Sequence, residues 1–339
     1  MLVDGQVNHN HSDPISYSGS MTLLDPDNLT GFDTYSPSDN ALYTDRMIRI
    51  VYSTWSPLLP RWVDCPIFCG PVTKVARDDT LVSLECQGKE SLTSEPAMAW
   101  KPKTYTKGMK LTALVRDLMA NYGGETRFDL LEQDVKTGRD YALLRESVPW
   151  SFARAVVGTS TRHLFYDGRG VLRLRPVPGS PLFTFGEASL LSVPKLEFNQ
   201  ADIRNTSLVK GATPEGKPQI TGWKYLPADH PSSPQSLAIN GKPRYLVQEI
   251  EDSNLTTQDA VNKAAQNSVN QLQNANVGFD FDSFVIPHLE PGDPFTLSTR
   301  DYSINLRANE FSIPLRAGTA QSNGVTRKLA ANKSRLRRK

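Results

Sequence analysis

The clearest hydrophobic period in the chain predicts an amphipathic helix that starts at Leu111. Apolar residues recur there at the spacing of one helical face, and the series comprises Leu111, Leu114, Val115, Leu118, Met119 and Tyr122. Gly123 and Gly124 follow directly and are typical of a helix C-terminus. This pattern separates the middle of the chain from the regions on either side, where shorter periods dominate.

Residues 148–178 contain a second helix followed by a hairpin. Pro149 stands where a first helical residue tolerates a missing N–H, and Gly158 is a stop signal ten positions into this segment. The apolar series between them is Phe152, Ala153, Val156 and Val157. A strand at His163–Tyr166 and a turn over residues 167–170 come next. The return strand alternates Leu172 and Leu174 with Arg173 and Arg175. His163, on the first strand, is interpreted as a structural histidine.

Short alternating runs on both sides of this region predict strands. The runs before it are Tyr17–Leu24, Arg46–Ser53, Trp62–Cys69, Val72–Ala76 and Leu81–Cys86. Pro57 and Pro60 interrupt the chain after Trp55, and Asp78-Asp79 predicts a hairpin turn. The runs after it are Leu196–Phe198, Ser207–Lys210, Tyr245–Ile250, Gly278–Ile286 and Phe295–Ser298.

Two further features interrupt the second group of strands. Residues 213–242 form a long polar insertion rich in Gly and Pro, which predicts a functional or disordered loop. Residues 257–274 carry a thin apolar stripe at helical spacing opposite an Asn/Gln-rich face, and Thr256 is the expected N-cap. We expect the insertion or this helix to make subunit or partner contacts.

Together these patterns predict a β-rich α+β protein. We expect a first β-barrel domain at 1–99, a small α+β domain at 100–182 and a second β-barrel domain at 183–318. Residues 319–339 are expected to form a basic, disordered arm.

Charge is distributed unevenly between the body and the C-terminal end. Arg327 to Lys339 hold seven basic residues and no acids, so removing them changes the net charge from +2 to −5. The arm is interpreted either as a solvated terminus or as an attachment to phosphates or an acidic surface. No aromatic residue interleaves with the basic ones, which argues against stacking on single-stranded nucleic acid. No specific nucleic acid sequence is expected as a partner.

The sequence predicts no catalytic, cofactor-binding or metal-binding residues. His9 and His11 lie at i, i+2 with Asp13 nearby, but no third ligand follows at tight spacing. Asp25, Asp27, Asp78 and Asp79 are interpreted as turn formers. No nucleophile elbow or phosphate loop is present in the sequence.

The remaining residue types narrow the class of protein further. Three cysteines, an odd number, argue against a disulfide framework and favour reduced thiols; they are Cys65, Cys69 and Cys86. The start of the chain lacks a signal-peptide pattern, and no window suits a membrane span, so neither secretion nor stable membrane insertion is expected. The aromatic run of Tyr43, Tyr52, Trp55 and Trp62 is interpreted as core or interface packing rather than as a sugar site.

Four stretches of the chain resemble the gp27-like tail hub proteins of long-tailed phages, specifically minor tail proteins of actinobacteriophages. The first is the opening strand with its T-L-x-D-P turn at Thr22–Pro26. The second runs from RMIRIVYS through PIFCGPVTKV to LECQGKESL, and the third is PWSFARAVVGTSTRHLFYDGRGVLRLRP. The fourth comprises VKGATPEGKP, the helix from Thr257, HLEPGDPF and FSIPL.

The resemblance implies a structural role in a virion. Hubs of this family are homotrimers in which each subunit supplies two tube-like β domains, so that three chains match the six-fold tail tube. Such a hub closes the tube below the distal tail ring, holds the tape measure protein and carries tip or fibre proteins. We therefore expect assembly in the host cytoplasm, a place at the tail tip, and roles in tail assembly and genome delivery. Many relatives continue into a lytic domain, which is not expected here.

Three other functions remain open, and one of them is a nucleic-acid binder that attaches through the basic residues of Arg327 to Lys339. A receptor- or glycan-binding tip protein predicts an exposed aromatic platform at Trp55 or Trp62. A cell-wall-degrading tail enzyme predicts an acidic pair in a cleft.

Overall fold

The computed structural model describes most of the chain. The described residues are 1–11, 13–28, 30, 42–95, 102–131, 135–158, 160, 162–176, 178–197, 203–216, 218–252, 255–272, 278–301, 303–316, 319–324 and 327–328. The predicted basic arm lies outside this set from residue 329 onward.

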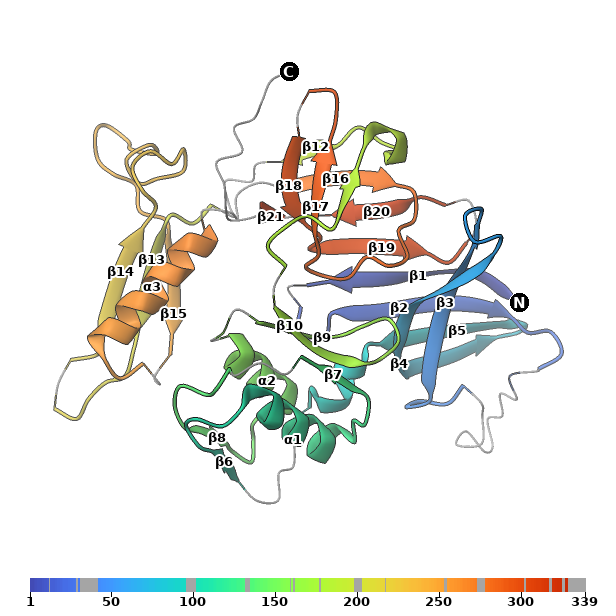
Figure 1. The fold of residues 1–339 in the computed structure, drawn as a ribbon, viewed down its shortest axis with the longest axis horizontal. Coiled ribbons are helices and arrows are strands. Elements are labelled where there is room, and N and C mark those ends of the chain that lie inside the picture. Colours follow the sequence, from blue (N-terminus) through green and yellow to red (C-terminus); the bar gives the residue numbers. More distant parts are fainter. Residues whose placement is uncertain are drawn as a thin grey trace.

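In the described part of the chain, nine strands form the largest sheet (Figure 1). In spatial order they are β12 (Lys195–Glu197), β16 (Gly278–Ser283), β20 (Gln321–Gly324), β19 (Glu310–Pro314), β1 (Leu2–Asn10), β2 (Tyr17–Leu24), β5 (Leu81–Gln87), β4 (Arg61–Asp78) and β3 (Met47–Ser56). The sheet joins the two predicted β segments, because β1 pairs antiparallel with β19. The division of the chain into two tube-like barrels stays a prediction.

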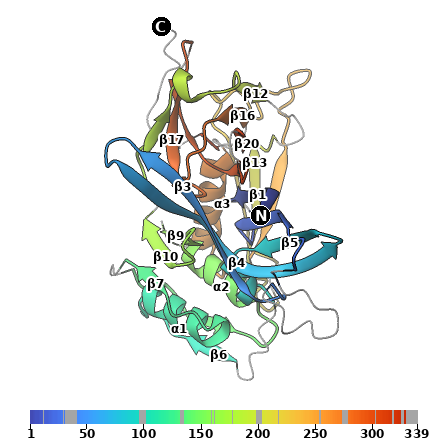
Figure 2. The same cartoon turned by 90° about the vertical axis from the view of Figure 1, so that its right-hand side faces the viewer.

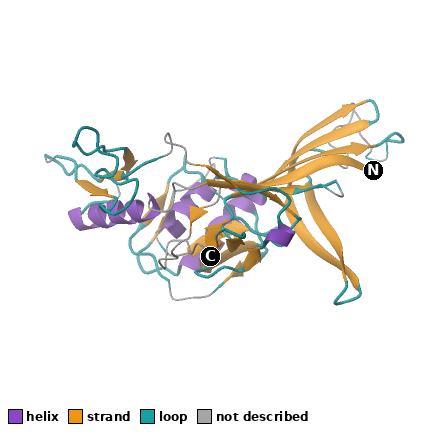
Figure 3. Cartoon of the chain, turned by 90° about the horizontal axis from the view of Figure 1, so that it is seen from above, coloured by secondary structure: helices purple, strands orange, loops and turns teal. Residues whose placement is uncertain are grey.

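Strands β3 and β4 form a long arm. β4 pairs with β3 along its first half and with β5 along its second half, and the exchange takes place at Gly70-Pro71. The sequence predicted two strands here, but the change of partner lets one strand of 18 residues continue through the proline. Figure 2 shows the arm running away from the rest of the molecule, and Figure 3 shows groups of strands diverging at the end opposite the lobe that contains helix α3 (Gln258–Leu272).

In the middle of the chain, the two predicted helices and the predicted hairpin form, together with three short strands that the sequence did not predict. Helices α1 (Leu111–Gly123) and α2 (Pro149–Gly158) pack together, and Gly124 after α1 adopts the left-handed conformation, with φ of 61°. The strands of this unit form two small sheets: β7 (Phe128–Leu130) with β10 (Leu172–Pro176) and β9 (Arg162–Tyr166), and β6 (Lys103–Tyr105) with β8 (Tyr141–Leu143). A short 3₁₀ turn, η2 (Lys89–Thr93), connects the unit to β5.

A lobe around α3 (Gln258–Leu272) corrects two predictions. The insertion 213–242 contains a strand, β14 (Thr221–Tyr225), which pairs with β13 (Thr206–Lys210); β13 also pairs with β15 (Val247–Glu251). The apolar stripe of α3 covers this sheet within the same chain, so it is not exposed for a partner. The N-cap is Thr257 rather than Thr256, because the hydroxyl of Thr257 accepts from the N–H of Ala260 at 3.2 Å.

The last strands complete the second β segment. They are β11 (Phe183–Phe185), β17 (Pro294–Ser298), β18 (Ser303–Arg307) and β21 (Arg327–Lys328), and a 3₁₀ turn, η3 (Glu187–Ser189), follows β11. The predicted arm at 319–339 therefore begins with ordered structure, since Gln321–Gly324 forms β20 and Arg327–Lys328 pairs with β18.

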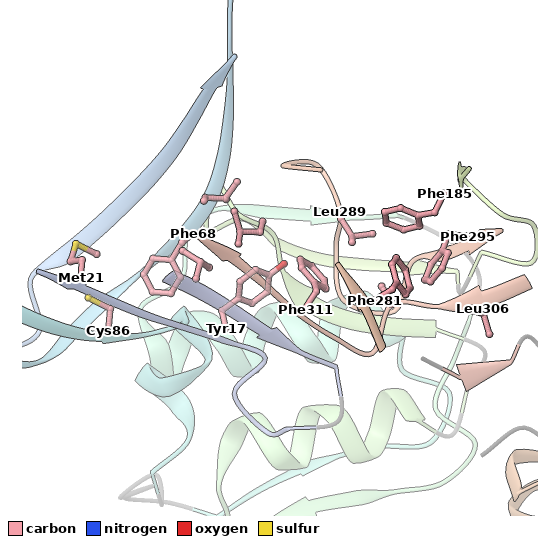
Figure 4. Close-up of a cluster of buried hydrophobic side chains, with 14 of the residues drawn as sticks. Tyr17, Met21, Phe68, Cys86, Phe185, Phe281, Leu289, Phe295, Leu306 and Phe311 are labelled. Carbon is pink, nitrogen blue, oxygen red and sulfur yellow. The ribbon is translucent and has the colours of Figure 1, made fainter. Parts of the chain in front are cut away.

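One hydrophobic core runs through both β segments. Figure 4 shows its buried side chains extending from Met21 and Cys86, past Tyr17 and Phe311, to Phe281 and Phe295. A second core fills the space between α1, α2 and the inner faces of β9 and β10. Burial on this scale removes a large apolar area from water and is the main stabilising contribution to the fold.

Candidate functional site

A large cleft lies where the β9–β10 hairpin meets the nine-stranded sheet. It has a volume of about 1000 Å³ and is lined by the hairpin, residues 64–66 of β4, the segment 287–293 and the turn 307–309. Figure 1 shows β9 and β10 between the helix pair and the large sheet. Segments from three distant parts of the sequence therefore share one cavity.

Strand alternation decides which hairpin side chains reach the cleft. Leu164, Tyr166, Leu172 and Leu174 are buried in the core beneath α1 and α2. The alternate residues lie on the opposite face, and cross-strand pairing sets Arg173 beside Phe165 and Arg175 beside His163. All four of these line the cleft. The Leu-Arg-Leu-Arg run of β10 thus has one face for the core and one for the cavity.

The turn of the hairpin is organised by Asp167. Its carboxylate accepts from the backbone N–H groups of Arg169 and Val171, each at 3.0 Å, and from the guanidinium of Arg173 at 2.7 Å. Gly168 presses against the backbone of β4, where an added Cβ would lie 2.2 Å from the carbonyl oxygen of Pro66. The turn therefore fixes the middle unit against the large sheet and closes one end of the cleft.

Replacing Gly168 with alanine is expected to reduce the free energy of unfolding by about 1–3 kcal/mol, the usual cost of overpacking. The new methyl group meets the Pro66 backbone, which cannot rotate away as a side chain can. Urea unfolding followed by tryptophan fluorescence measures the loss. Gly186→Ala is the matched control, because its added methyl group meets open space; equal stability of the two variants would contradict the packing argument.

The opposite wall is a tight turn at residues 289–293. Gly292 has φ of 87°, a conformation that favours glycine, and its carbonyl accepts from Arg307 at 2.7 Å. The carboxylate of Asp293 accepts from the N–H of Glu290 at 2.9 Å, and Glu290 accepts from the hydroxyl of Tyr17. The carboxyl groups of this wall are thus held by the chain itself.

Burial shifts several ionisation equilibria around the cleft. It raises the pKa of Glu290 to about 8 and that of Asp293 to about 6, and it lowers the pKa of His163 to about 3. His163 lies 4.6 Å, ring to ring, from His11, and both histidines line the cleft. At neutral pH, Glu290 is therefore mostly protonated and His163 is uncharged, so the arginines set the charge of the cavity.

The structure places the candidate residues of the sequence apart from one another. His9 is buried and stacks on Phe311 at 4.2 Å, whereas His11 faces His163. Cys65, Cys69 and Cys86 are free thiols, as predicted, but Cys65 and Cys69 are only half-buried. No group of three or more potential metal ligands occurs among the described residues. No helix in the described ranges is long and apolar enough to cross a membrane.

Of the predicted turn aspartates, Asp27 and Asp79 lie in turns, whereas Asp78 is the last residue of β4. Asp25 accepts from the backbone N–H and the hydroxyl of Thr30, at 3.1 and 2.6 Å, and Asp79 adopts a left-handed φ of 51°. In the aromatic run, Tyr52 packs against the core, whereas Trp55 and Trp62 form an exposed edge-to-face pair with ring centroids 6.0 Å apart. These two tryptophans therefore do not lie in the core of this chain, and interface packing, the other part of the expectation, stays a prediction.

The arginines and Glu290 were not singled out from the sequence. The alternation of Arg173 and Arg175 with leucines was visible and marks them as facing away from the core. The cleft arginines lie beside the segment 287–293 because strands more than a hundred residues apart in sequence pair with each other. No local sequence pattern indicates such pairings.

Comparisons with known proteins bear on the fold. No family model matches this chain, and no curated protein sequence matches it. Three solved structures, however, resemble it along almost its whole length. The first is a tail protein from Neisseria meningitidis MC58, with a TM-score of 0.63, 9% identity and coverage of 96% of this chain and 91% of that one.

The other two come from prophages. The 43 kDa tail protein of prophage MuSo2 from Shewanella oneidensis has a TM-score of 0.62 and 7% identity, with coverage of 96% and 92%. Prophage tail protein gp18 from Listeria monocytogenes EGD-e has a TM-score of 0.55 and 7% identity, with coverage of 97% and 89%. At these identities the likeness concerns the fold. The predicted β-rich architecture is confirmed: this chain has the fold of these three tail proteins.

Proposed function

We propose that this chain is a structural, non-enzymatic component of a long-tailed phage tail. In this proposal it forms a homotrimeric hub at the tail tip, closes the tail tube below the distal tail ring, and contacts the tape measure and the tip or fibre proteins. The supporting observation is the end-to-end likeness to three tail proteins, each of which covers at least 96% of this chain. Assembly in the cytoplasm of an actinobacterial host and a part in genome delivery belong to the same proposal.

Exposed edges and apolar groups support an assembling protein. Strands β3 and β12 end the nine-stranded sheet, so each presents one unpaired edge in the described structure. The tip of the β3–β4 arm exposes Leu58 at 91% and Trp62 at 65%. Apolar groups that protrude in this way are typical of surfaces that another subunit covers. We assign the β3–β4 arm, together with the polar face of α3, to contacts within the trimer or with neighbouring tail proteins.

The oligomeric state of the purified chain tests the proposal. Native mass spectrometry is expected to give a particle of three chain masses, and electron microscopy is expected to show a central channel. If the chain alone is monomeric, the same measurement is repeated with the distal tail protein encoded by the same phage. A chain that stays monomeric under both conditions would contradict the hub.

A receptor- or glycan-binding tip protein is the second candidate, because Trp55 and Trp62 are exposed as that function requires. Their rings lie at 74° to each other, so they do not form one flat platform. Binding of host cell-wall polysaccharide that is lost in Trp55→Ala/Trp62→Ala, but kept in Trp223→Ala at the far lobe, would favour this candidate over the hub.

A further inference from the structure

Two arginines in the cleft hold N–H donors for which the described residues provide no acceptor. Nη1 of Arg162 and Nε of Arg175 are buried and have no hydrogen-bond partner among the described residues. Arg175 makes one ion pair, from Nη2 to Asp129 at 2.9 Å. A buried N–H group without an acceptor is costly, and this cost is largest for charged groups. We therefore expect these two side chains to donate hydrogen bonds to a bound ligand, because the described residues of the cleft do not accept from them.

The carboxylates of the cleft are, in contrast, already engaged. Asp64 accepts from the hydroxyl of Ser53 at 2.7 Å, and Asp167 accepts from Arg173 and from backbone N–H groups. Glu290 accepts from Tyr17. The groups left for a ligand are the N–H donors of Arg162 and Arg175. They favour a ligand that carries hydrogen-bond acceptors.

Charge favours an anion as well. Five arginines line the cleft, namely Arg162, Arg169, Arg173, Arg175 and Arg307, against four carboxyl groups. One of these, Glu290, is mostly protonated at neutral pH because burial raises its pKa to about 8. Asp129 lies outside the lining but pairs with Arg173 and Arg175, so four carboxylates other than Glu290 stand against five arginines, and the cavity keeps a small positive charge although the body of the chain is acidic.

Part of the remaining lining is apolar and suits a polypeptide. Flat, rigid surfaces come from Pro66, Pro176, Pro178, Pro287 and Pro291, with Phe165 and Leu182 between them. A volume of about 1000 Å³ stands at the upper end of the range for enclosed ligand sites, far beyond the needs of one inorganic ion. These flat apolar surfaces can pack against the aliphatic parts of a peptide, so the lining favours a peptide over a phosphate-rich strand.

We propose that this cleft binds an acidic polypeptide segment of another protein, with Arg162 and Arg175 holding its Asp or Glu carboxylates. Guanidinium groups bind carboxylates through paired, charge-assisted hydrogen bonds, and the prolines and Phe165 pack against the apolar parts of the segment. That the partner is a neighbouring tail protein rests on the proposed function; the chemistry of the cleft does not.

Fluorescence anisotropy with short labelled peptides tests the site on the full chain. A peptide that alternates Glu with Ala is expected to bind at ~50 mM salt, where screening is weak, and its Gln-Ala counterpart is not. Arg162→Gln/Arg175→Gln is expected to weaken binding about tenfold or more. The charge-matched control Arg145→Gln/Arg300→Gln, whose side chains are exposed outside the cleft, is expected to leave it unchanged.

A second readout needs no arginine substitution and so does not depend on how well the double variant folds. Cys65 lines the cleft and is half-buried, so the Glu-Ala peptide is expected to slow its alkylation by iodoacetamide, as mapped by mass spectrometry. Absence of both binding and protection would overturn the proposal. So would equal weakening in the control variant, displacement of the peptide by inorganic phosphate at equal concentration, or tighter binding of labelled oligothymidylate through the same arginines. None of these results depends on trimer formation, so failure here and failure of the hub are distinguishable.

Discussion

Replacing Trp150 with alanine is expected to lower the free energy of unfolding by about 3–5 kcal/mol, the range for deleting a large buried aromatic side chain. Trp150 is 1% exposed and stacks on Tyr166 with ring centroids 5.7 Å apart. Its indole N–H donates to the carbonyl of Pro14 at 2.6 Å, so the substitution also leaves that carbonyl without its donor. Urea unfolding monitored by circular dichroism measures the change.

Two variants separate the contribution of aromatic packing at Trp150 from that of its indole N–H hydrogen bond and from the loss of any tryptophan. Trp150→Phe keeps most of the aromatic packing and removes the indole N–H, so its loss is expected to be about 1–3 kcal/mol, smaller than that of the alanine variant. Trp223→Ala removes the same side chain from a site that is 54% exposed, and it is expected to change stability by less than about 0.5 kcal/mol. Similar losses in Trp150→Ala and Trp223→Ala would show that Trp150 does not anchor the helix.

Trp150 matters because it connects two parts of the chain that are distant in sequence. From the next turn of α2, Arg154 donates to the carbonyl of Asp13 at 2.6 Å. Both contacts hold the segment between β1 and β2 against the helix. Loosening them is expected to disturb the position of the β9–β10 hairpin, and through it the cleft.

The helices and the hairpin of the middle unit were predictable from the sequence. Their periodicity, the proline at the start of α2 and the glycines after α1 are local signals, and the contacts they specify form within a few dozen residues. The Asp167 turn is equally local, because the carboxylate accepts N–H groups two and four positions further along the chain.

The arrangement of the large sheet was not predictable in the same way. β1 pairs with β19 across some 300 residues, and a strand's alternation indicates which side is buried but not which strand lies beside it. β14 was overlooked because three of its five residues are glycine, lysine and threonine, and its aromatic residues are exposed. The cleft depends on these non-local pairings. The sequence therefore indicated only that Arg173 and Arg175 face away from the core, not that they line a cleft.

Two buried glutamates are expected to destabilise the fold as the pH rises from 4.5 to about 8, and because two buried histidines oppose them at lower pH, the net fall in stability is expected above about pH 6.5. Burial raises the pKa of Glu90 to about 7 and that of Glu290 to about 8, from 4.5 in the unfolded chain. In this window the unfolded chain has released protons that the folded chain keeps, so raising the pH favours unfolding by up to ~1.4 kcal/mol per pH unit for each group. Above about pH 8 both states are ionised, and the decline ends.

Two buried histidines act in the opposite direction at lower pH. Burial lowers the pKa of His9 and His163 from 6.5 to about 3. Between these pH values the two histidines bind protons in the unfolded chain but not in the folded chain. Their contribution to stability therefore rises with pH between about 3 and 6.5. The two effects oppose each other between 4.5 and 6.5, and above 6.5 only the glutamates remain.

Glu290→Gln isolates one glutamate. Glutamine can still accept from the Tyr17 hydroxyl but does not ionise, so relative to the wild type the variant is expected to gain up to ~1.4 kcal/mol per pH unit between 4.5 and about 8. Urea unfolding at about pH 5 and about pH 8 measures this gain, with the exposed Glu146→Gln as the control. If wild type and Glu290→Gln lose stability in parallel, Glu290 ionises as easily in the folded chain as in the unfolded one, and the wall of the cleft is open to water.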